Sequence, residues 1–81
     1  MTIVRDFLEK NRKRLLGFRI IICDLDEYEY IHFRMSEKTD FDNFNNVYDQ
    51  QMLDSDIYDF NIYPYPDPED KEVYIITDIE L

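Results

Sequence analysis

Two aspartates, Asp24 and Asp26, stand directly after an aliphatic run at residues 18–23. Two carboxylates one residue apart at the end of a strand can hold a magnesium ion and present a nucleophile to a phosphate ester. The chain, however, continues at once into an alternating stretch at residues 28–35, which predicts an antiparallel partner strand. Since only residues 24–27 separate the two strands, the pair is interpreted as the acidic tip of a hairpin.

The same Asp-x-Asp pair resembles the first motif of haloacid-dehalogenase-type phosphatases. In that family a parallel central strand leads into a loop and a helix, and the motif continues with a glycine and a small hydroxyl residue or valine. Here Glu27 and Tyr28 follow, and a chain of 81 residues is short for the family's doubly wound domain. The resemblance therefore assigns no catalytic residue, and we predict no enzyme activity.

The chain lacks the residue types and spacings of other common catalytic and metal sites. Gly17 is the only glycine, so a phosphate-cradling loop is not expected. Cys23 is the only cysteine and His32 the only histidine, which excludes an internal disulfide and a Cys/His zinc site. Residues 24–26 and 54–56 lack the glycine and final glutamate of a calcium loop, which leaves weak calcium binding as a minor alternative. We predict no metal and no cofactor.

The first half of the chain predicts a helix followed by a hairpin of two strands. Residues 2–16 predict a helix with Thr2 as N-cap and Gly17 after its last turn. Residues 18–23 are apolar at nearly every position, which indicates a central strand buried on both faces. Residues 28–35 alternate, with Ile31, Phe33 and Met35 on one face and Tyr28, Tyr30, His32 and Arg34 on the other.

The second half of the chain predicts a short helix and two more strands. Thr39 and Asp42 fit a capping box, with Thr39 as N-cap of a helix that runs to about Met52. Residues 57–63 and 72–81 alternate as strands, and a stiff, proline-rich acidic loop at 64–70 joins them.

These elements predict one α+β domain over residues 1–81, with an antiparallel sheet of about four strands. The N-terminal helix and the short second helix are expected on one face of the sheet. The start of the chain does not read as a signal peptide, and no apolar run approaches the ~20 residues that a bilayer requires. We therefore expect a cytoplasmic protein without membrane contact.

Charge is divided unevenly along the chain. Residues 1–19 hold six bases and two acids, a net of +4, whereas residues 20–81 hold three bases and seventeen acids, a net of −14. The total of −10 exceeds what solubility requires and is not mixed in sign. Because self-repulsion destabilises a compact domain, such segregation suggests a binding role for the acidic part.

The acidic part alternates with tyrosines, which supply large contact areas in interfaces. Along a strand, residues i and i+2 lie about 6.6 Å apart, roughly two nucleotide rises, so a row of aspartates can approximate a row of phosphates. Asp54, Asp56 and Asp59 are expected at the centre of this surface. The predicted partner-binding residues are Asp40, Asp42, Tyr48, Asp49, Asp54, Asp56, Asp59 and Tyr63.

In size, acidity and Tyr/Asp-rich strands the chain resembles the DNA-mimicking inhibitors of phages and mobile elements, such as uracil-DNA glycosylase inhibitors and anti-CRISPR proteins. The resemblance implies a nucleic-acid-binding partner protein with a basic groove. One alternative is a structural or adaptor subunit that forms a homodimer or larger oligomer through its basic helix and acidic remainder. Direct nucleic-acid binding through residues 10–14 is a weaker alternative, because the net charge repels the ligand.

Overall fold

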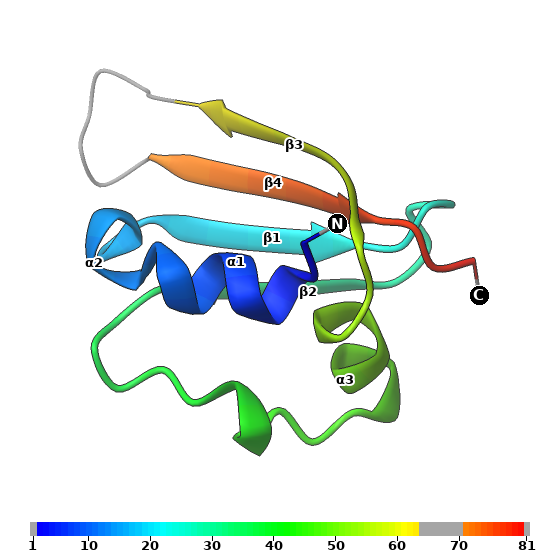
Figure 1. Cartoon of the computed structure of the whole chain (residues 1–81), viewed down its shortest axis with the longest axis horizontal. Helices are drawn as coiled ribbons and strands as arrows, with labels where there is room; N and C mark the ends of the chain where they lie inside the picture. The colour runs from blue at the N-terminus through cyan, green and yellow to red at the C-terminus, as the bar shows by residue number, and fades with distance from the viewer. Residues whose placement is uncertain (1, 64–70, 81) are drawn as a thin grey trace.

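The computed structural model describes residues 2–63 and 71–80 (Figure 1). Two consecutive helices, α1 (Val4–Lys10) and α2 (Arg12–Leu15), precede the strands β1 (Arg19–Cys23) and β2 (Tyr30–Arg34). A 3-10 turn, η1 (Phe41–Asn43), and helix α3 (Val47–Leu53) follow, and strands β3 (Ile57–Tyr63) and β4 (Glu72–Thr77) complete the chain. The α+β class predicted from the sequence is confirmed.

The strands form one sheet in the order β2-β1-β4-β3. β1 is antiparallel to β2 and β3 to β4, but β1 and β4 run parallel. The prediction of a purely antiparallel sheet is therefore wrong, although the central position of β1 is confirmed. Hairpin-length connections fix only the orientation within each sequential pair. The segment between β2 and β3 crosses from one edge of the sheet to the other, and this crossing makes β4 meet β1 in parallel.

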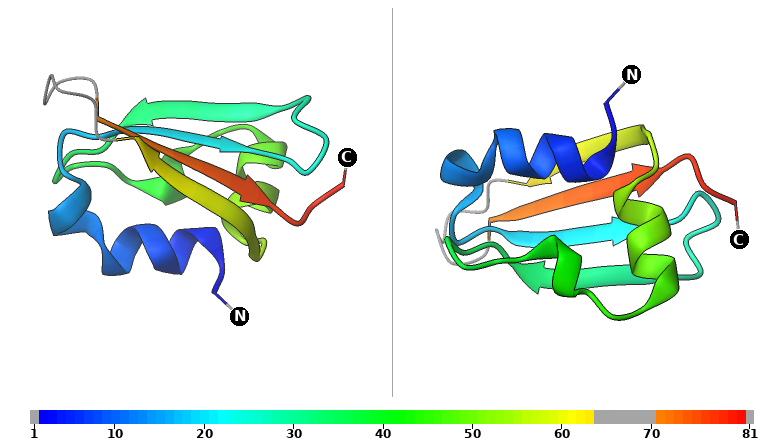
Figure 2. Two further views of the ribbon diagram at one scale, coloured as in Figure 1. Left: turned by 90° about the horizontal axis from the view of Figure 1, so that it is seen from above. Right: turned by 60° about the horizontal axis from the view of Figure 1, so that its bottom comes forward.

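The helices α1 and α3 and the turn η1 lie on the same face of the sheet (Figure 2), as predicted. Phe7 of α1 stacks on Phe60 of β3 with ring centroids 5.4 Å apart. Phe33 of β2 contacts Phe44, beside η1, at 5.3 Å. The core between these layers consists of Val4, Leu8, Leu15, Ile20, Ile22, Ile31, Met35, Phe41, Met52, Leu53, Val73 and Ile75.

The N-terminal helix differs from the prediction of one helix over residues 2–16. Ile3, not Thr2, precedes the first turn, and no side chain caps it. The Thr2 carbonyl instead accepts a hydrogen bond from the N–H of Ile57 at 3.0 Å, which ties the start of the chain to β3. Asn11 separates α1 from α2, and its side-chain amide donates to the Phe7 carbonyl at 2.8 Å. Gly17 has a φ of 83°, the left-handed conformation expected after a helix.

The predicted second helix is divided into two pieces. Thr39 does not cap it, because its Oγ1 accepts from the N–H of Ser36 at 2.9 Å. Asp40 caps η1, and Asn46 caps α3 by accepting from the N–H of Tyr48 at 2.8 Å. Asparagine is a strong N-cap and a poor interior residue, so the asparagines of this segment interrupt the helix and restart it.

Strand β3 spans the predicted residues, whereas β2 and β4 are shorter than predicted. β2 begins at Tyr30 rather than residue 28, because the N–H groups before it donate to a side chain in the β1–β2 loop. β4 ends at Thr77 rather than residue 81, and the next N–H, of Asp78, donates to the Asp56 carbonyl at 3.0 Å. The predicted acidic loop at 64–70 lies outside the described residues.

Candidate functional site

Asp24 is an architectural residue of the β1–β2 loop. It is completely buried, and its two carboxylate oxygens accept from the N–H groups of Tyr28 at 2.9 Å and Glu29 at 3.2 Å. Its own N–H donates to the Glu29 carbonyl, and its carbonyl accepts from Glu27, which has a φ of 61°. The carboxylate thus holds the tight loop in place, and its hydrogen-bonding capacity is directed at backbone groups.

Two of the predicted partner-binding aspartates meet at Arg5 of α1. The Arg5 guanidinium donates to Asp42 Oδ1 at 2.8 Å, to Asp54 Oδ1 at 2.9 Å and to Gln50 Oε1. We call Arg5, Asp42, Gln50 and Asp54 the Arg5 cluster. One guanidinium is shared by two carboxylates, so the positive charge of Arg5 offsets about one of the two negative charges and the cluster keeps a net charge of −1. Asp54 was predicted to lie at the centre of a solvent-facing acidic surface; its side chain is 59% exposed, but it shares Arg5 with Asp42.

Asp40, the N-cap of η1, and Tyr48 of α3 are near members of the Arg5 cluster in the sequence. The Asp40 carboxylate accepts from the N–H of Asp42 at 3.1 Å and from the Asn43 side chain at 2.9 Å, so it serves as a cap. Tyr48 lies in the first turn of α3 with 43% of its surface exposed, so its ring is free to contact a partner.

Carboxylates from four parts of the chain gather at one end of the molecule. The β1–β2 loop, α3, the first residues of β3 and the segment after β4 all lie there (Figures 1 and 2). Backbone hydrogen bonds connect them: Leu25 donates to Ile79 at 2.9 Å, and Asp78 donates to Asp56 at 3.0 Å. We call this set the acidic end; it consists of Asp26, Glu27, Glu29, Asp49, Asp56, Asp59, Asp78 and Glu80.

The charges of the acidic end are not compensated by the described part of the chain. None of its carboxylates makes an ion pair with residues 2–63 or 71–80. Burial, followed by the negative charge of Glu29, raises the pKa of the Asp49 carboxyl above its ordinary value. Because Asp49 belongs to α3 and Glu29 to the β1–β2 loop, carboxylates from separate elements are close enough to repel one another.

No described helix covers the second face of the sheet. The strand register places Asp59 beside Ile76 on this face, whereas the next residue, Phe60, points toward α1. The side chains on this face include Arg34, His32 and Tyr30 of β2, Arg19 and Ile21 of β1, Glu72, Tyr74 and Ile76 of β4, and Asp59, Asn61 and Tyr63 of β3. Tyr30 is 66% exposed and lies toward the acidic end, so it can contribute an aromatic contact there.

Cys23 also belongs to this second face, but it is buried. Its thiol donates to the Tyr74 hydroxyl at 3.5 Å, and burial raises the pKa of the thiol. A protonated, inaccessible thiol is a poor nucleophile. The burial of Cys23 agrees with the prediction that residues 18–23 form a strand buried on both faces.

Among residues 2–63 and 71–80, cations gather at the opposite end, where Glu72 forms an ion pair with Arg19 at 3.9 Å. Arg19 is the register partner of Arg34, and its N–H donates to the Lys71 carbonyl at 2.9 Å, so α2, the start of β1, the end of β2 and the start of β4 converge. We call Lys13, Arg14, Arg19, Arg34 and Lys71 the basic end. Tyr63 lies there, beside Glu72, and is therefore separated from the other predicted partner-binding residues.

The predicted set is thus divided by the fold into three parts. Asp49, Asp56 and Asp59 belong to the acidic end, Asp40, Asp42, Tyr48 and Asp54 lie at or beside the Arg5 cluster, and Tyr63 lies at the basic end. Sequence reasoning missed Asp26, Glu27, Glu29, Asp78 and Glu80. The sequence does show acids concentrated after the residues that form β1 and β4. Without the pairing of β1 with β4, however, it does not show that these acids lie close together.

No family model, curated protein or solved structure matches the chain. Within the described ranges, no group of three or more His, Cys, Asp or Glu residues is arranged to hold a metal ion. Every helix in those ranges is too short and too polar to cross a lipid bilayer. A functional assignment must therefore come from the chain's own residues.

Proposed function

We propose that this protein is a non-catalytic inhibitor that covers the positively charged, nucleic-acid-binding surface of a partner protein. The observation that carries the proposal is the acidic end, where carboxylates from four segments stand together without compensating cations among the described residues. Arg5, between Asp42 and Asp54, shows that this fold can place a cation beside its acids, but no described cation pairs with the carboxylates of the acidic end. Their retention as free charges is what a ligand for a basic surface requires.

The acidic end offers its charges on an ordered scaffold. Two backbone hydrogen bonds join the β1–β2 loop, the segment after β4 and the start of β3, and Asp24 fixes the loop from within. Fixed anions lose little conformational freedom when they meet arginines or lysines. Tyr28 and Tyr30, exposed by 82% and 66%, stand in the same region and supply the aromatic contact area that interfaces favour. Such a surface competes with a phosphate backbone for a basic groove in the cytoplasm.

The proposal is tested by capture and competition. Immobilised protein is exposed to a bacterial lysate, bound material is eluted with a salt gradient, and each captured protein is assayed for duplex DNA binding by electrophoretic shift. The proposal predicts a captured DNA-binding protein from which this chain displaces the duplex. Captured proteins that bind no nucleic acid, or that bind DNA and this chain at the same time, would contradict it.

Self-association is a second candidate, favoured by the separation of the acidic and basic ends. Contact between the acidic end of one copy and the basic end of another gives a dimer if the two copies pair reciprocally about a two-fold axis. It gives a ring or an open chain if the contact runs head to tail. Size-exclusion chromatography at low and high salt separates the two candidates. A large species at low salt that dissociates at high salt supports self-association, whereas a monomer in both conditions supports the inhibitor.

A further inference from the structure

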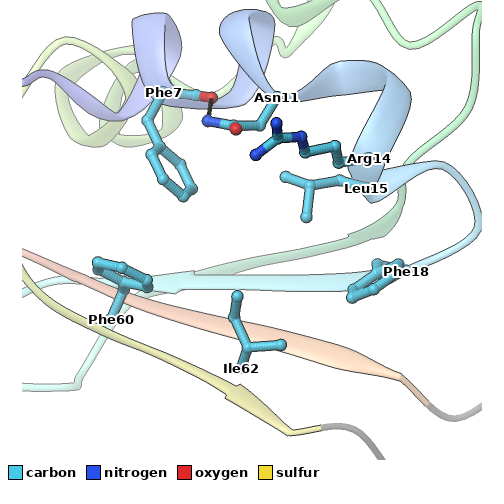
Figure 3. Close-up of a pocket in the computed structure, with 7 residues that line it drawn as sticks. All are labelled: Phe7, Asn11, Arg14, Leu15, Phe18, Phe60 and Ile62. Atoms are coloured by element: carbon cyan, nitrogen blue, oxygen red, sulfur yellow. Dashed lines mark hydrogen bonds between the residues drawn. The ribbon is translucent and has the colours of Figure 1, made fainter.

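An apolar pocket of about 340 Å³ lies between the helices and β3, away from the acidic end (Figure 3). Phe7, Leu15 and Arg14 line it from α1 and α2, and Phe60 and Ile62 line it from β3. Phe18 and Asn11 complete the lining. Its volume falls at the lower end of the range of small-molecule sites, roughly 300 to 1,000 Å³.

The pocket exists because the helical layer does not fully cover β3. Phe60 and Ile62 point to the core side of the sheet, yet they are 45% and 49% exposed. Phe7 packs on Phe60, but beyond it the helix turns at Asn11, whose amide is held by the Phe7 carbonyl. Figure 3 shows Phe7 and Leu15 facing Phe60 and Ile62 across the space that this turn leaves. An apolar group of a ligand would remove this surface from water.

One cation lines the pocket and a second contacts a lining residue, although the chain as a whole is acidic. Arg14 lines it and makes no ion pair with any residue in the described ranges. The Lys71 ammonium lies over the ring of Phe18, another lining residue, at 5.6 Å from its centroid. No carboxylate is among the described residues that line it. The described lining therefore combines apolar side chains with one cation, Arg14, and a second cation contacts the lining residue Phe18.

We propose that this pocket binds a small amphiphilic anion, a monocarboxylate with a medium-length alkyl or aromatic tail. The tail lies among Phe7, Phe60 and Ile62, and the carboxylate pairs with the Arg14 guanidinium, whose fork of N–H donors matches two carboxylate oxygens. A nucleic-acid phosphate is too polar for such a lining. The acidic end of a second copy is a less suitable occupant, because its carboxylates would pair with the cations but would not fill the apolar interior. The proposal is independent of the proposed function, because it concerns the other end of the molecule.

The test uses the intact protein and decanoate, kept below its micelle-forming concentration. Binding is measured by isothermal titration calorimetry, and its place by amide chemical shifts in ¹H–¹⁵N spectra. Decanoate should raise the melting temperature and shift the amides of Phe18, Phe60 and Ile62. Acetate, which lacks the tail, and decanol, which lacks the charge, should each bind at least about tenfold more weakly.

A matched pair of variants on α2 locates the headgroup. Arg14→Gln should weaken decanoate binding about tenfold, because a charge-assisted hydrogen bond is lost. Lys13→Gln removes the same charge from an exposed neighbour that does not line the pocket, and should change affinity less than about twofold. Ile62→Glu, which places a carboxylate at the pocket wall, should abolish binding while the protein remains folded.

Several results would overturn the proposal. Equal losses in Arg14→Gln and Lys13→Gln would show that bulk charge alone attracts decanoate. A lowered melting temperature would identify decanoate as a detergent rather than a ligand. Unshifted pocket amides would place any binding elsewhere, and a dimer whose interface covers Phe60 and Ile62 would assign the pocket to a second copy.

Discussion

Asp42 and Asp54 share Arg5, whereas Asp49 lies close enough to Glu29 for its pKa to be raised. In the first region one cation on α1 links η1 to the end of α3, so the two aspartates help to hold three segments together. In the second region carboxylates from α3 and the β1–β2 loop repel each other with no cation between them in the described ranges. Carboxylates therefore stabilise the fold at Arg5 and destabilise it where Asp49 lies near Glu29.

The carboxylates of this chain therefore fall into two classes with opposite effects on stability. Aspartates that cap helices, close loops or face Arg5 contribute to the structure, and their loss should destabilise it. Aspartates and glutamates of the acidic end contribute little to the structure, and their neutralisation should stabilise it. The sign of the stability change on neutralisation is therefore a simple way to separate the two classes.

The largest effect is expected for Asp24, the one buried carboxylate beside the acidic end. Asp24→Ala leaves the N–H groups of Tyr28 and Glu29 without their acceptor and should cost roughly 2 to 4 kcal/mol. Total stability at this length is about 4 to 12 kcal/mol, so chemical denaturation should show a much weakened fold. Asp26→Ala, in the same loop but exposed, is the control and should leave stability unchanged or higher. Equal destabilisation by both changes would mean that Asp24 has no special role.

A smaller loss is expected when the Arg5 cluster is broken. Arg5→Met should cost about 1 to 2 kcal/mol, since the guanidinium is largely buried but both carboxylate partners are exposed. Lys10→Met on the same helix should cost less than about 0.5 kcal/mol.

The partner aspartate gives a sharper test through a double-mutant cycle. Asp54→Asn should destabilise the wild-type protein, where it faces Arg5, and stabilise the Arg5→Met variant, where it faces only another carboxylate. The same sign in both backgrounds would show that Arg5 does not compensate Asp54.

Neutralising the acidic end should stabilise the protein modestly. The double change Glu29→Gln with Asp78→Asn should raise the melting temperature at about 20 mM NaCl, and the gain should shrink at about 300 mM as screening shortens the range of repulsion. The control pair Asp6→Asn with Glu37→Gln removes equal charge from exposed residues outside the acidic end and should give a smaller gain. A loss of stability in the first pair would show that the acidic end is compensated after all.

The smallest effect concerns Asp49 and depends on pH. Its pKa is raised in the folded state above the ordinary value of 3.8, so folding favours its protonated form. Its contribution is therefore greatest below pH 3.8 and is lost as the pH rises through the raised folded value. Asp49→Asn should melt a few degrees higher than the wild type at neutral pH and at the same temperature in acid. A difference that does not vary with pH would exclude this titration as its cause.

Local patterns in the sequence predicted much of the fold. Strand β3 was found to the residue from its alternation, β1 was placed centrally from its apolar residues, and Gly17 marked the end of the helical segment. The division at Asn11 and the caps at Asp40 and Asn46 were missed, because each depends on which of several competing local hydrogen bonds forms.

The candidate site was less predictable because it depends on long-range pairing. Arg5 meets residues 37 and 49 positions away, so no local pattern reveals that Asp42 and Asp54 share a cation. The acidic end depends on the parallel pairing of β1 with β4, which brings the β1–β2 loop beside residues 78–80. Charge counts showed that acids were in excess, but the strand order decides which of them remain unpaired.

The central claim, that the acidic end is a defined binding surface, is tested most directly by affinity. The DNA-binding protein captured from lysate is titrated with the wild type, the Glu29→Gln/Asp78→Asn variant and the Asp6→Asn/Glu37→Gln variant across a range of salt. The first variant should bind about a hundredfold more weakly with a shallower salt dependence, because each lost anion faced a cation of the partner. The second variant should bind within about threefold of the wild type. Equal weakening of both variants would contradict a defined site and leave net charge as the only source of attraction.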